Sequence, residues 1–354
     1  MKNNLSKIVC TLIFLMSAGF IYSQENTTKG TFDYTFYIDA YYSYDFSNPP
    51  DHNRPDFLYQ YNRHDQFGIN MAMAKVNYTR GRLTANLGIN TGDFPAANMA
   101  HERELLRILY EANIGYYVSD KVEFTVGMFS SHMGFESALS FDNLLASHSL
   151  ASEWTPYYLM GAKVEYTPIK ELLLGFTVAN GNQAITEYSW NTNKLIGIQV
   201  NYAPSESVTF NYSNMYYNDM PDSSSNFIFY NNFYGTVKVN KYLEFIYGFD
   251  YAIAENRDDM YVSSLLLKYS INKKFAVAGR YEYYNDPGGI YINTSSEVGF
   301  VCNGYSLNFD YSPMKELKVR IEGRIFDTID ATYYNSGAHL DTNSNLLLTL
   351  QAKF

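Results

Sequence analysis

The stretch that decides the fold is LKVRIEGRIF, at residues 317–326. Apolar and charged side chains alternate along it: Leu317, Lys318, Val319, Arg320, Ile321, Glu322, Arg324 and Ile325. A period of two predicts a β-strand with one apolar face and one charged face. Many other stretches of the chain share this pattern, so the fold depends on the solvent that each face meets.

A short repeat separates these stretches and predicts a tight hairpin turn at each place. It begins with Tyr, continues through turn-forming residues that often include Lys, and has an apolar residue six positions after the Tyr. The clear copies are YYVSDKV at 116, YTPIKEL at 166, YAPSESV at 202, YSINKKF at 269 and YSPMKEL at 311. Shorter or degenerate copies occur at Tyr78 and near Val239.

Seven such turns join fourteen strands, and one more strand at each end of the alternating region brings the predicted number to sixteen. The predicted strands are 32–44, 67–78, 83–91, 107–117, 122–128, 157–166, 172–179, 195–202, 208–217, 226–239, 243–252, 260–269, 275–284, 298–311, 317–326 and 344–354. The remaining connections are long and irregular, so tight turns and long loops alternate strictly.

This alternation favours one architecture. Bacterial outer-membrane barrels have an even number of strands, short periplasmic turns and long external loops. A soluble β-sandwich or propeller is the alternative, but nothing in its physics makes every second connection long. We therefore predict an all-β fold, a transmembrane antiparallel β-barrel whose apolar faces meet lipid and whose charged faces line the interior.

The N-terminus indicates export. Lys2 and Lys7 precede an apolar run from Ile8 to Ile21 that is too short to span a bilayer, and small or polar residues follow. We predict a signal peptide over 1–23 and an outer-membrane β-barrel over 24–354.

Composition excludes one class of partner. The chain has 26 basic and 36 acidic residues, and this acidic balance makes a nucleic-acid partner unfavourable. Removal of the signal peptide leaves Cys302 as the single cysteine, so no internal disulfide is expected. Acidic residues concentrate in the long loops, where divalent ions would bridge them to lipopolysaccharide; a merely solvated surface is the alternative.

The tyrosines of the repeat predict where the membrane boundary lies. They share the parity of the apolar faces and sit where each strand ends, as expected for an aromatic belt in an outer-membrane barrel. The last strand, LLLTLQAKF, ends on Phe354, an ending that bacterial barrels present to their assembly machinery. A barrel of about sixteen strands is too wide for side chains to fill and is expected to hold water.

The loop over 130–155 is the longest and predicts a constriction, by analogy with the third external loop of general porins. The predicted constriction and pore-lining residues are Arg280, Arg320, Arg324, Lys163, Lys268, Glu136, Asp142 and Glu153. The three acids would face the three arginines across the lumen, and the resulting transverse field would favour polar over apolar solutes. An exposed loop is the alternative.

The same loop carries a family resemblance. Gly134–Glu136, Ser137, Asn143, the SHSL at Ser147–Leu150 and the segment Pro156–Tyr166 resemble the putative β-barrel porin-2 (OmpL-like) family of Bacteroidota outer membranes. The resemblance covers nearly the whole chain after the signal peptide and implies a porin-like channel. It supplies no catalytic residues, and the arginine ladder of trimeric porins is matched only loosely, so a homo-oligomer is left open.

We therefore predict a porin for passive diffusion of small hydrophilic solutes, with no cofactor and no enzymatic activity. One alternative is a selective sugar or oligopeptide porin with an aromatic slide of Tyr37, Tyr41, Tyr230 and Tyr234. The other is a structural or adhesin barrel plugged by its loops. Neither HExxH nor G-x-S-x-G occurs, although His132 with Glu136 and His148 with Glu153 have spacings that a metal would accept.

Overall fold

The computed structural model describes residues 29–218, 220–224, 226–294, 296–330, 333–335 and 338–354. The predicted signal peptide over 1–23 lies outside the described residues and stays a prediction.

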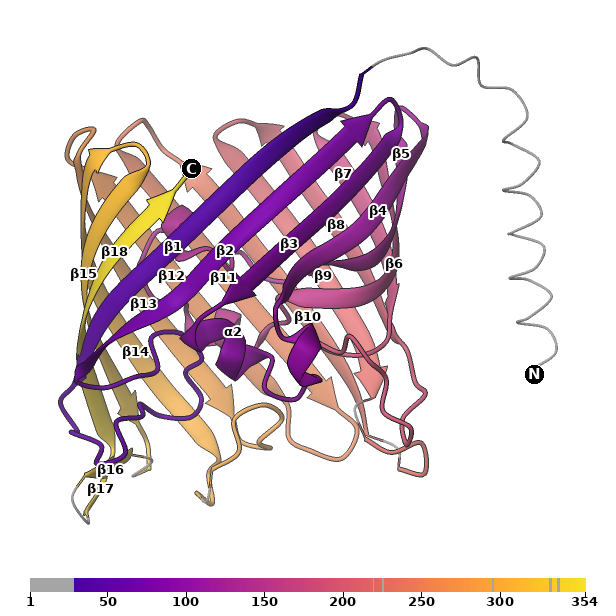
Figure 1. Cartoon of the computed structure of the whole chain (residues 1–354). Coiled ribbons are helices and arrows are strands. Elements are labelled where there is room, and N and C mark those ends of the chain that lie inside the picture. The colour runs from indigo at the N-terminus through magenta and orange to yellow at the C-terminus, as the bar shows by residue number, and fades with distance from the viewer. Residues whose placement is uncertain (1–28, 219, 225, 295, 331–332, 336–337) are drawn as a thin grey trace.

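A closed barrel of sixteen antiparallel strands forms from the described part of the chain (Figure 1). The strands are β1 Thr31–Asp45, β2 Gln66–Arg80, β3 Leu83–Thr91, β4 Leu109–Ser119, β5 Val122–Ser130, β6 Tyr158–Ile169, β7 Leu172–Ala179, β8 Leu195–Ser205, β9 Val208–Asn218, β10 Phe227–Lys238, β11 Leu243–Ala254, β12 Met260–Ser270, β13 Phe275–Asp286, β14 Phe300–Met314, β15 Leu317–Thr328 and β18 Thr342–Lys353. All sixteen predicted barrel strands are therefore confirmed.

Each strand pairs with its neighbours in the barrel sequence, and β1 pairs with β18 to close the sheet. The register places Tyr37 opposite Lys353, and the backbones of Phe36 and Phe354 exchange hydrogen bonds of 3.2 and 2.9 Å. Closure satisfies the strand edges, because an open edge in hydrocarbon would leave backbone groups without partners.

Short elements lie in the connections. They are the helices α2 Asp93–Asn98 and α3 Leu150–Trp154, the 3₁₀ turns η2 Glu104–Leu106 and η3 Ser140–Asp142, and the hairpin β16 Tyr333–Asn335 with β17 Ala338–Leu340. The prediction of irregular loop is wrong for each of these segments. No helix in the described ranges is long and apolar enough to cross a membrane.

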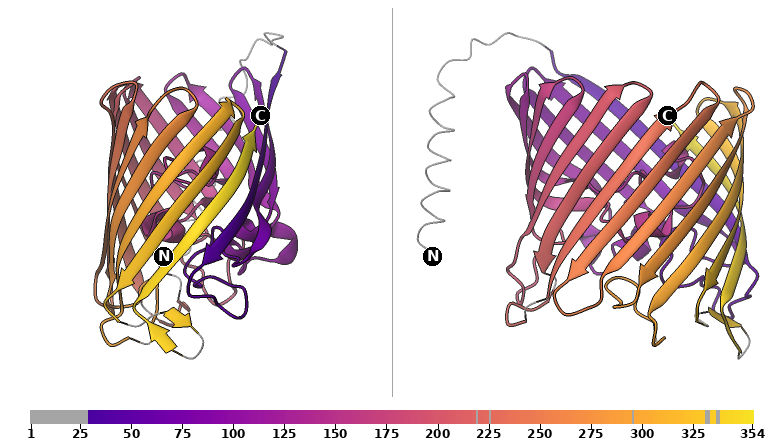
Figure 2. Two further views of the ribbon diagram at one scale, coloured as in Figure 1. Left: turned by 90° about the vertical axis from the view of Figure 1, so that its left-hand side faces the viewer. Right: turned by 180° about the vertical axis from the view of Figure 1, so that it is seen from behind.

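The tight turns gather at one end of the tilted strands and the long loops at the other, as the views in Figure 2 also show. We name the long loops in chain order: L1 46–65, L2 92–108, L3 131–157, L4 180–194, L5 219–226, L6 255–259, L7 287–299 and L8 329–341. The C-terminus lies at the end with the tight turns (Figure 2).

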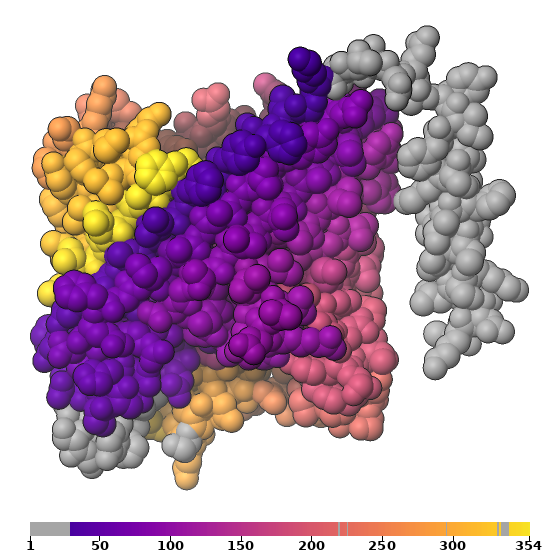
Figure 3. All heavy atoms as spheres, in the orientation of Figure 1, coloured from indigo at the N-terminus to yellow at the C-terminus, as the bar shows by residue number. Residues whose placement is uncertain are grey.

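The two faces of β15 point as its alternation predicts. Ile321 and Ile325 are 46% and 48% exposed on the outside, whereas Arg320, Glu322 and Arg324 are buried inside. The tyrosines of the repeat are also exposed on the outer face: Tyr116, Tyr166, Tyr202, Tyr269 and Tyr311. Side chains cover the outer surface over β1 to β4 (Figure 3).

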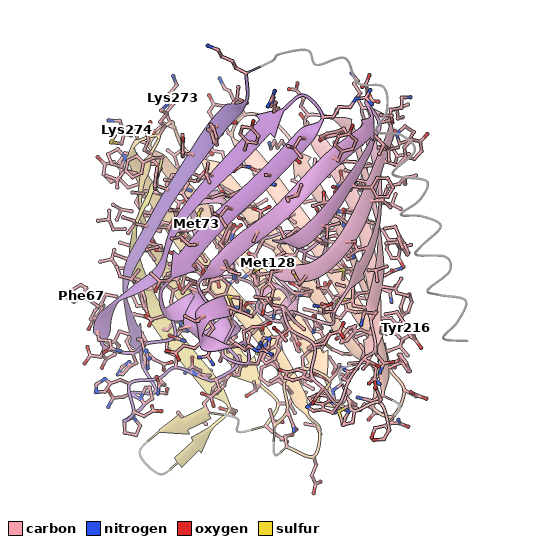
Figure 4. The ribbon with its side chains drawn as sticks, turned by 45° about the vertical axis from the view of Figure 1, so that its right-hand side comes forward. Phe67, Met73, Met128, Tyr216, Lys273 and Lys274 are labelled. Atoms are coloured by element: carbon pink, nitrogen blue, oxygen red, sulfur yellow. The ribbon has the colours of Figure 1, made fainter. Side chains whose placement is uncertain are left out.

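Aromatic side chains also mark the other end of the outer face. Phe67 and Tyr216 project outward near the long loops, whereas Lys273 and Lys274 lie at the tight-turn end (Figure 4). Apolar residues thus fill the outer face between two aromatic boundaries, which is the arrangement of a barrel surrounded by lipid.

We expect the replacement of Ile321 by arginine to destabilise the barrel in a bilayer by about 2–4 kcal/mol, because this side chain faces hydrocarbon near the middle of β15. Urea unfolding in lipid vesicles measures the effect, and Ile321→Leu is the matched control. If arginine were tolerated as well as leucine, water rather than lipid would surround this face.

The interior near the long loops is filled by an apolar core. Wall residues such as Leu195, Met215 and Tyr284 pack against Phe57 of L1 and Leu150 of L3. Charged residues occupy the wall beyond this core, toward the tight turns. The loops therefore fold into the barrel and pack against its wall.

Candidate constriction site

L3 leaves β5, crosses the interior and returns to β6. Near its start, the carbonyl oxygen of Asn214 lies 2.9 Å from Nε2 of His132, and the side chain of Asn232 accepts a bond of 3.2 Å from the backbone N–H of Gly134. Farther along, L3 reaches β13, β15 and β18 on the other side. L3 therefore lies inside the barrel, and the exposed-loop alternative is wrong.

L3 holds its own shape through side-chain bonds to its backbone. The side chain of Asn143 accepts from the N–H of Ser137 and donates to its carbonyl, both at 2.8 Å. A carboxylate oxygen of Glu136 accepts from the backbone and the hydroxyl of Ser149, at 2.8 and 2.7 Å. Gly134 has a φ of 83°, which favours glycine. These residues belong to the segments that carry the family resemblance.

Arg320 of β15 is the strongest attachment of L3 to the wall. Its guanidinium is fully buried and donates to the L3 carbonyls of Ser140, Asn143, Leu144 and Leu145 at 2.7 to 3.2 Å. Its Nε donates at 2.7 Å to Asp310 of β14, which neutralises the charge. One wall arginine therefore satisfies four backbone carbonyls of a loop that would otherwise be buried without partners.

Ser147 of L3 forms a second attachment. Arg280 donates to the Ser147 carbonyl at 2.7 Å and to its hydroxyl at 3.0 Å. Glu322 accepts from the backbone N–H of Ser147 at 2.8 Å and from its hydroxyl at 2.6 Å. Every polar group of this residue is thus paired to β13 or β15.

The start of α3 forms the third attachment. Glu282 of β13 accepts from the backbone N–H of Leu150 at 2.6 Å and from Arg324 at 2.5 Å. Arg280 lies 3.2 Å from the same carboxylate. The buried cluster alternates positive and negative charges, so each charge has an opposite partner in a region that water does not reach.

Of the three acids of L3, one lies beside a predicted arginine and two have different partners from those predicted. Glu136 lies 3.8 Å from Arg280, but Asp142 pairs with Lys353 at 2.6 Å. Glu153 is buried and accepts from the backbone of Tyr59 and Gln60 in L1. The predicted pairing across an open gap is therefore corrected, because L3 is long enough to reach the arginines and bind them directly.

Of the two predicted lysines, one lies on the wall away from these attachments and the other lies beside Arg320. Lys163 pairs with Glu165 at 2.8 Å and lines a cavity of about 260 Å³ beside His132. Lys268 lies 3.5 Å from Asp310 and shares that carboxylate with Arg320. The role of all eight predicted residues in permeation stays a prediction.

L1 contacts L3 through two titratable side chains of L3, Glu153 and His148. Burial raises the pKa of Glu153 to about 8, although the N–H groups of Tyr59 and Gln60 favour its charged form. Burial lowers the pKa of His148 to about 3, so the imidazole is neutral; its Nδ1 lies 2.6 Å from the Tyr157 hydroxyl. Sequence reasoning missed the participation of L1, since no local pattern signals it.

Cavities remain on both sides of L3. Two of about 260 Å³ lie between L3 and the strands from β2 to β8, and both are lined by Ser130, Ser131 and Gly134. Two others, of about 1090 and 370 Å³, lie among the long loops and share Trp154 and Tyr291. Among the described residues, none lines a cavity of both pairs, and L3 contributes lining residues to all four cavities.

The predicted aromatic slide is wrong for three of its four tyrosines. Tyr37, Tyr41 and Tyr230 are at most 2% exposed, because L1, L3 and L7 pack over this part of the wall. A metal at His132 or His148 also finds no support, since the described residues contain no group of three or more His, Cys, Asp or Glu side chains arranged to hold one.

The comparisons with known proteins agree with the barrel fold described above. A family model described as "Putative beta-barrel porin-2, OmpL-like" matches residues 31–354. Among curated proteins, no relative matches the chain.

Solved structures share the fold at low sequence identity. An anion-selective porin from Comamonas acidovorans is 10% identical, with 92% of this chain and 100% of that chain covered and a TM-score of 0.62. Salmonella typhi OmpF is 11% identical, with coverage of 91% and 97% and a TM-score of 0.63. OmpT of Vibrio cholerae in its trimer form is 11% identical, with coverage of 92% and 100% and a TM-score of 0.59.

Proposed function

The chain belongs to the putative β-barrel porin-2, OmpL-like, family, and we propose from that premise that small hydrophilic solutes diffuse past L3 along the wall of β2 to β8. It is a porin of the bacterial outer membrane. The observation that supports this route is that L3 binds β9, β10, β13, β15 and β18 and leaves cavities beside β2 to β8. Arg280, Arg320 and Arg324 bind the loop to β13 and β15, and cavities remain beside the opposite wall.

The lining of this route fits polar solutes of either charge. Lys163 and Glu165 lie together on β6, with Thr177 and Gln199 beside them in the same cavity. Opposite charges side by side produce little net potential, so we propose weak ion selectivity and discrimination mainly by solute size.

We propose that the protein has no enzymatic activity. His132 contacts a backbone carbonyl, and His148 is buried, neutral and bonded between L1 and L3. Both ring nitrogens of His148 are hydrogen-bonded, and the second ring nitrogen of His132, Nδ1, is buried away from solvent, so neither suits a general base that must reach a substrate.

The proposed partners are lipid, other copies and the assembly machinery. The acidic long loops suit divalent bridges to lipopolysaccharide, and the exposed ring of Phe354 suits recognition by the barrel assembly machinery. OmpT of Vibrio cholerae has a trimer form, and a homo-oligomer is proposed here on that likeness of fold.

We expect the purified protein to produce discrete conductance steps in planar bilayers and to let liposomes swell at rates that fall with solute size. Protein-free bilayers and heat-denatured protein are the controls. Folded protein that leaves the bilayer sealed would favour the loop-plugged structural barrel instead.

A further inference from the structure

The long loops enclose a vestibule, which we define as the cavity of about 1090 Å³ together with the adjoining cavity of about 370 Å³. L1, L3, L7 and L8 line the first cavity, and L1 to L4 with L7 line the second. Such volumes are typical of sites for small organic ligands. Trp154 and Tyr291 line both cavities, so one extended ligand that crosses these rings would occupy the two.

Aromatic rings form the floor of the vestibule. The Trp154 ring lies 5.2 Å from Tyr59 and 6.3 Å from Tyr291, as measured between ring centroids. In the smaller cavity, Tyr188 and Trp190 stack at 4.6 Å with an interplanar angle of 8°. Both tryptophans of the chain are therefore in the vestibule, where flat apolar faces are available to a ligand with polar edges.

The central rings are held in place before any ligand arrives. Asp286 accepts from the backbone N–H groups of Ile290, Tyr291 and Ile292 at 2.7 to 2.9 Å, and this fixes the start of L7. The Tyr291 hydroxyl bonds to that of Tyr217 on the wall. Trp154 ends α3, whose first residue is bonded to Glu282. Rigid rings reduce the entropy lost on binding.

Polar groups around these rings are mainly amides, hydroxyls and carboxylates. Asn293, Thr294 and Ser296 of L7 line the larger cavity, and Asn182 and Asn191 of L4 line the smaller one. The indole nitrogen of Trp154, Oγ1 of Thr294 and Oδ1 of Asn182 are buried without a hydrogen-bond partner among the described residues. Small rotations of these side chains would let a ligand supply those partners.

Charge argues against an anionic ligand. Among the described residues, Arg54 is the only Lys or Arg that lines either cavity, and it is buried against Asn345 and Asp45. Acidic residues at the rim, such as Asp51 and Asp56, would repel anions. The lining therefore suits a ligand without negative charge that has apolar ring faces and many hydroxyl groups.

We propose that the vestibule binds a neutral oligosaccharide, with sugar rings stacked on Trp154 and Tyr291 and hydroxyl groups bonded to the amides of L4 and L7. This inference rests on the proposed channel function and names its substrate class. Because Trp154 belongs to L3, sugar bound there would contact the loop that forms the constriction. Two joined cavities favour chains of two or more sugar units over a monosaccharide.

The test measures binding in detergent solution, without any need for conduction. The intact protein is titrated with maltotriose, cellotriose, laminaritriose and chitotriose, with glucose and tetraglycine as comparisons, and binding is followed by calorimetry and tryptophan fluorescence. We expect saturable binding of at least one trisaccharide, with weaker binding of glucose and none of tetraglycine. The fluorescence should respond because both tryptophans line the site.

Trp154→Ala is expected to weaken that binding at least tenfold, and Asn182→Ala is a milder second variant that leaves the α3 packing intact. Phe67→Ala, on the lipid face, is the matched control and should bind like the wild type. The proposal is overturned if no trisaccharide binds, if tetraglycine binds instead, or if both vestibule variants bind normally. Conduction without sugar binding would overturn the oligosaccharide site alone. Sugar binding without conduction would overturn the proposed channel function.

Discussion

Arg320→Ala is expected to raise the single-channel conductance severalfold, because it releases L3 from the wall of the barrel. The substitution removes the donors of four L3 carbonyls at once. Each buried carbonyl left without a donor costs on the order of 1–3 kcal/mol, and four such losses are enough to reverse the docking equilibrium of a loop. The undocked loop would leave a wider path along the lumen.

The barrel itself should survive this change. Its closed ladder of strand pairs does not involve L3, and Asp310 keeps a partner because Lys268 lies 3.5 Å from it. Planar-bilayer recordings measure the conductance, and the shift in gel mobility on heating checks that the barrel is folded.

Two variants separate the release of L3 from a general loss of charge. Lys268→Ala removes a partner of the same Asp310 without touching L3, so its conductance should stay near that of the wild type. Arg320→Lys keeps some of the hydrogen-bond donors, so its conductance should lie between that of the wild type and that of Arg320→Ala. A folded Arg320→Ala protein with unchanged conductance would show that L3 does not limit the channel.

Raising the pH from 5 to 9 is expected to loosen the contact between L1 and L3, and Glu153→Gln should abolish this dependence. Burial raises the Glu153 pKa to about 8 in the folded protein, so the folded state holds the proton more tightly than the unfolded chain does. The stabilisation is complete below the ordinary pKa of about 4.5 and is lost as the pH rises through 8; each pKa unit is worth about 1.4 kcal/mol.

Other charges near Glu153 modify this shift without reversing it. Arg324 lowers the Glu153 pKa and Glu136 raises it, while burial is the largest cause. The readout is protease cleavage within L1 at pH 5, 7 and 9, with a parallel recording of channel noise. Glu187→Gln in L4 is the control, since Glu187 is partly exposed and pairs with Lys194. Equal pH dependence in the wild type and Glu153→Gln would refute the role of this carboxyl.

The strands and their faces were predictable because their signal is local. Period-two alternation fixes the two faces of β15, and the tyrosine repeat fixes the turns, so the predicted and observed strand ends differ by only a few residues. The hairpin β16–β17 was missed because its strands are three residues long, too short for alternation to stand out.

The partners within the constriction were less predictable because they join residues far apart in the sequence. Loop length and rank correctly indicated that L3 enters the barrel. They did not indicate that Arg320 would bind backbone carbonyls or that Asp142 would form an ion pair with Lys353. Nor did they indicate that Glu153 would accept hydrogen bonds from the backbone of L1. Such choices depend on the path of the loop through the lumen, for which the sequence has no periodic signal.

The central claim is that water reaches the interior of this cylinder while lipid covers its exterior. A pair of single cysteines tests it, in a background where the buried Cys302 is replaced by alanine. Lys163→Cys lies in the lumen beside L3, and Ile321→Cys lies on the outer face of β15. A charged thiol reagent that cannot enter hydrocarbon is applied to both proteins in bilayers while conductance is recorded. The reagent should modify only Lys163→Cys and reduce its conductance. Modification of Ile321→Cys alone would mean that the inner and outer faces of the barrel have been assigned the wrong way round.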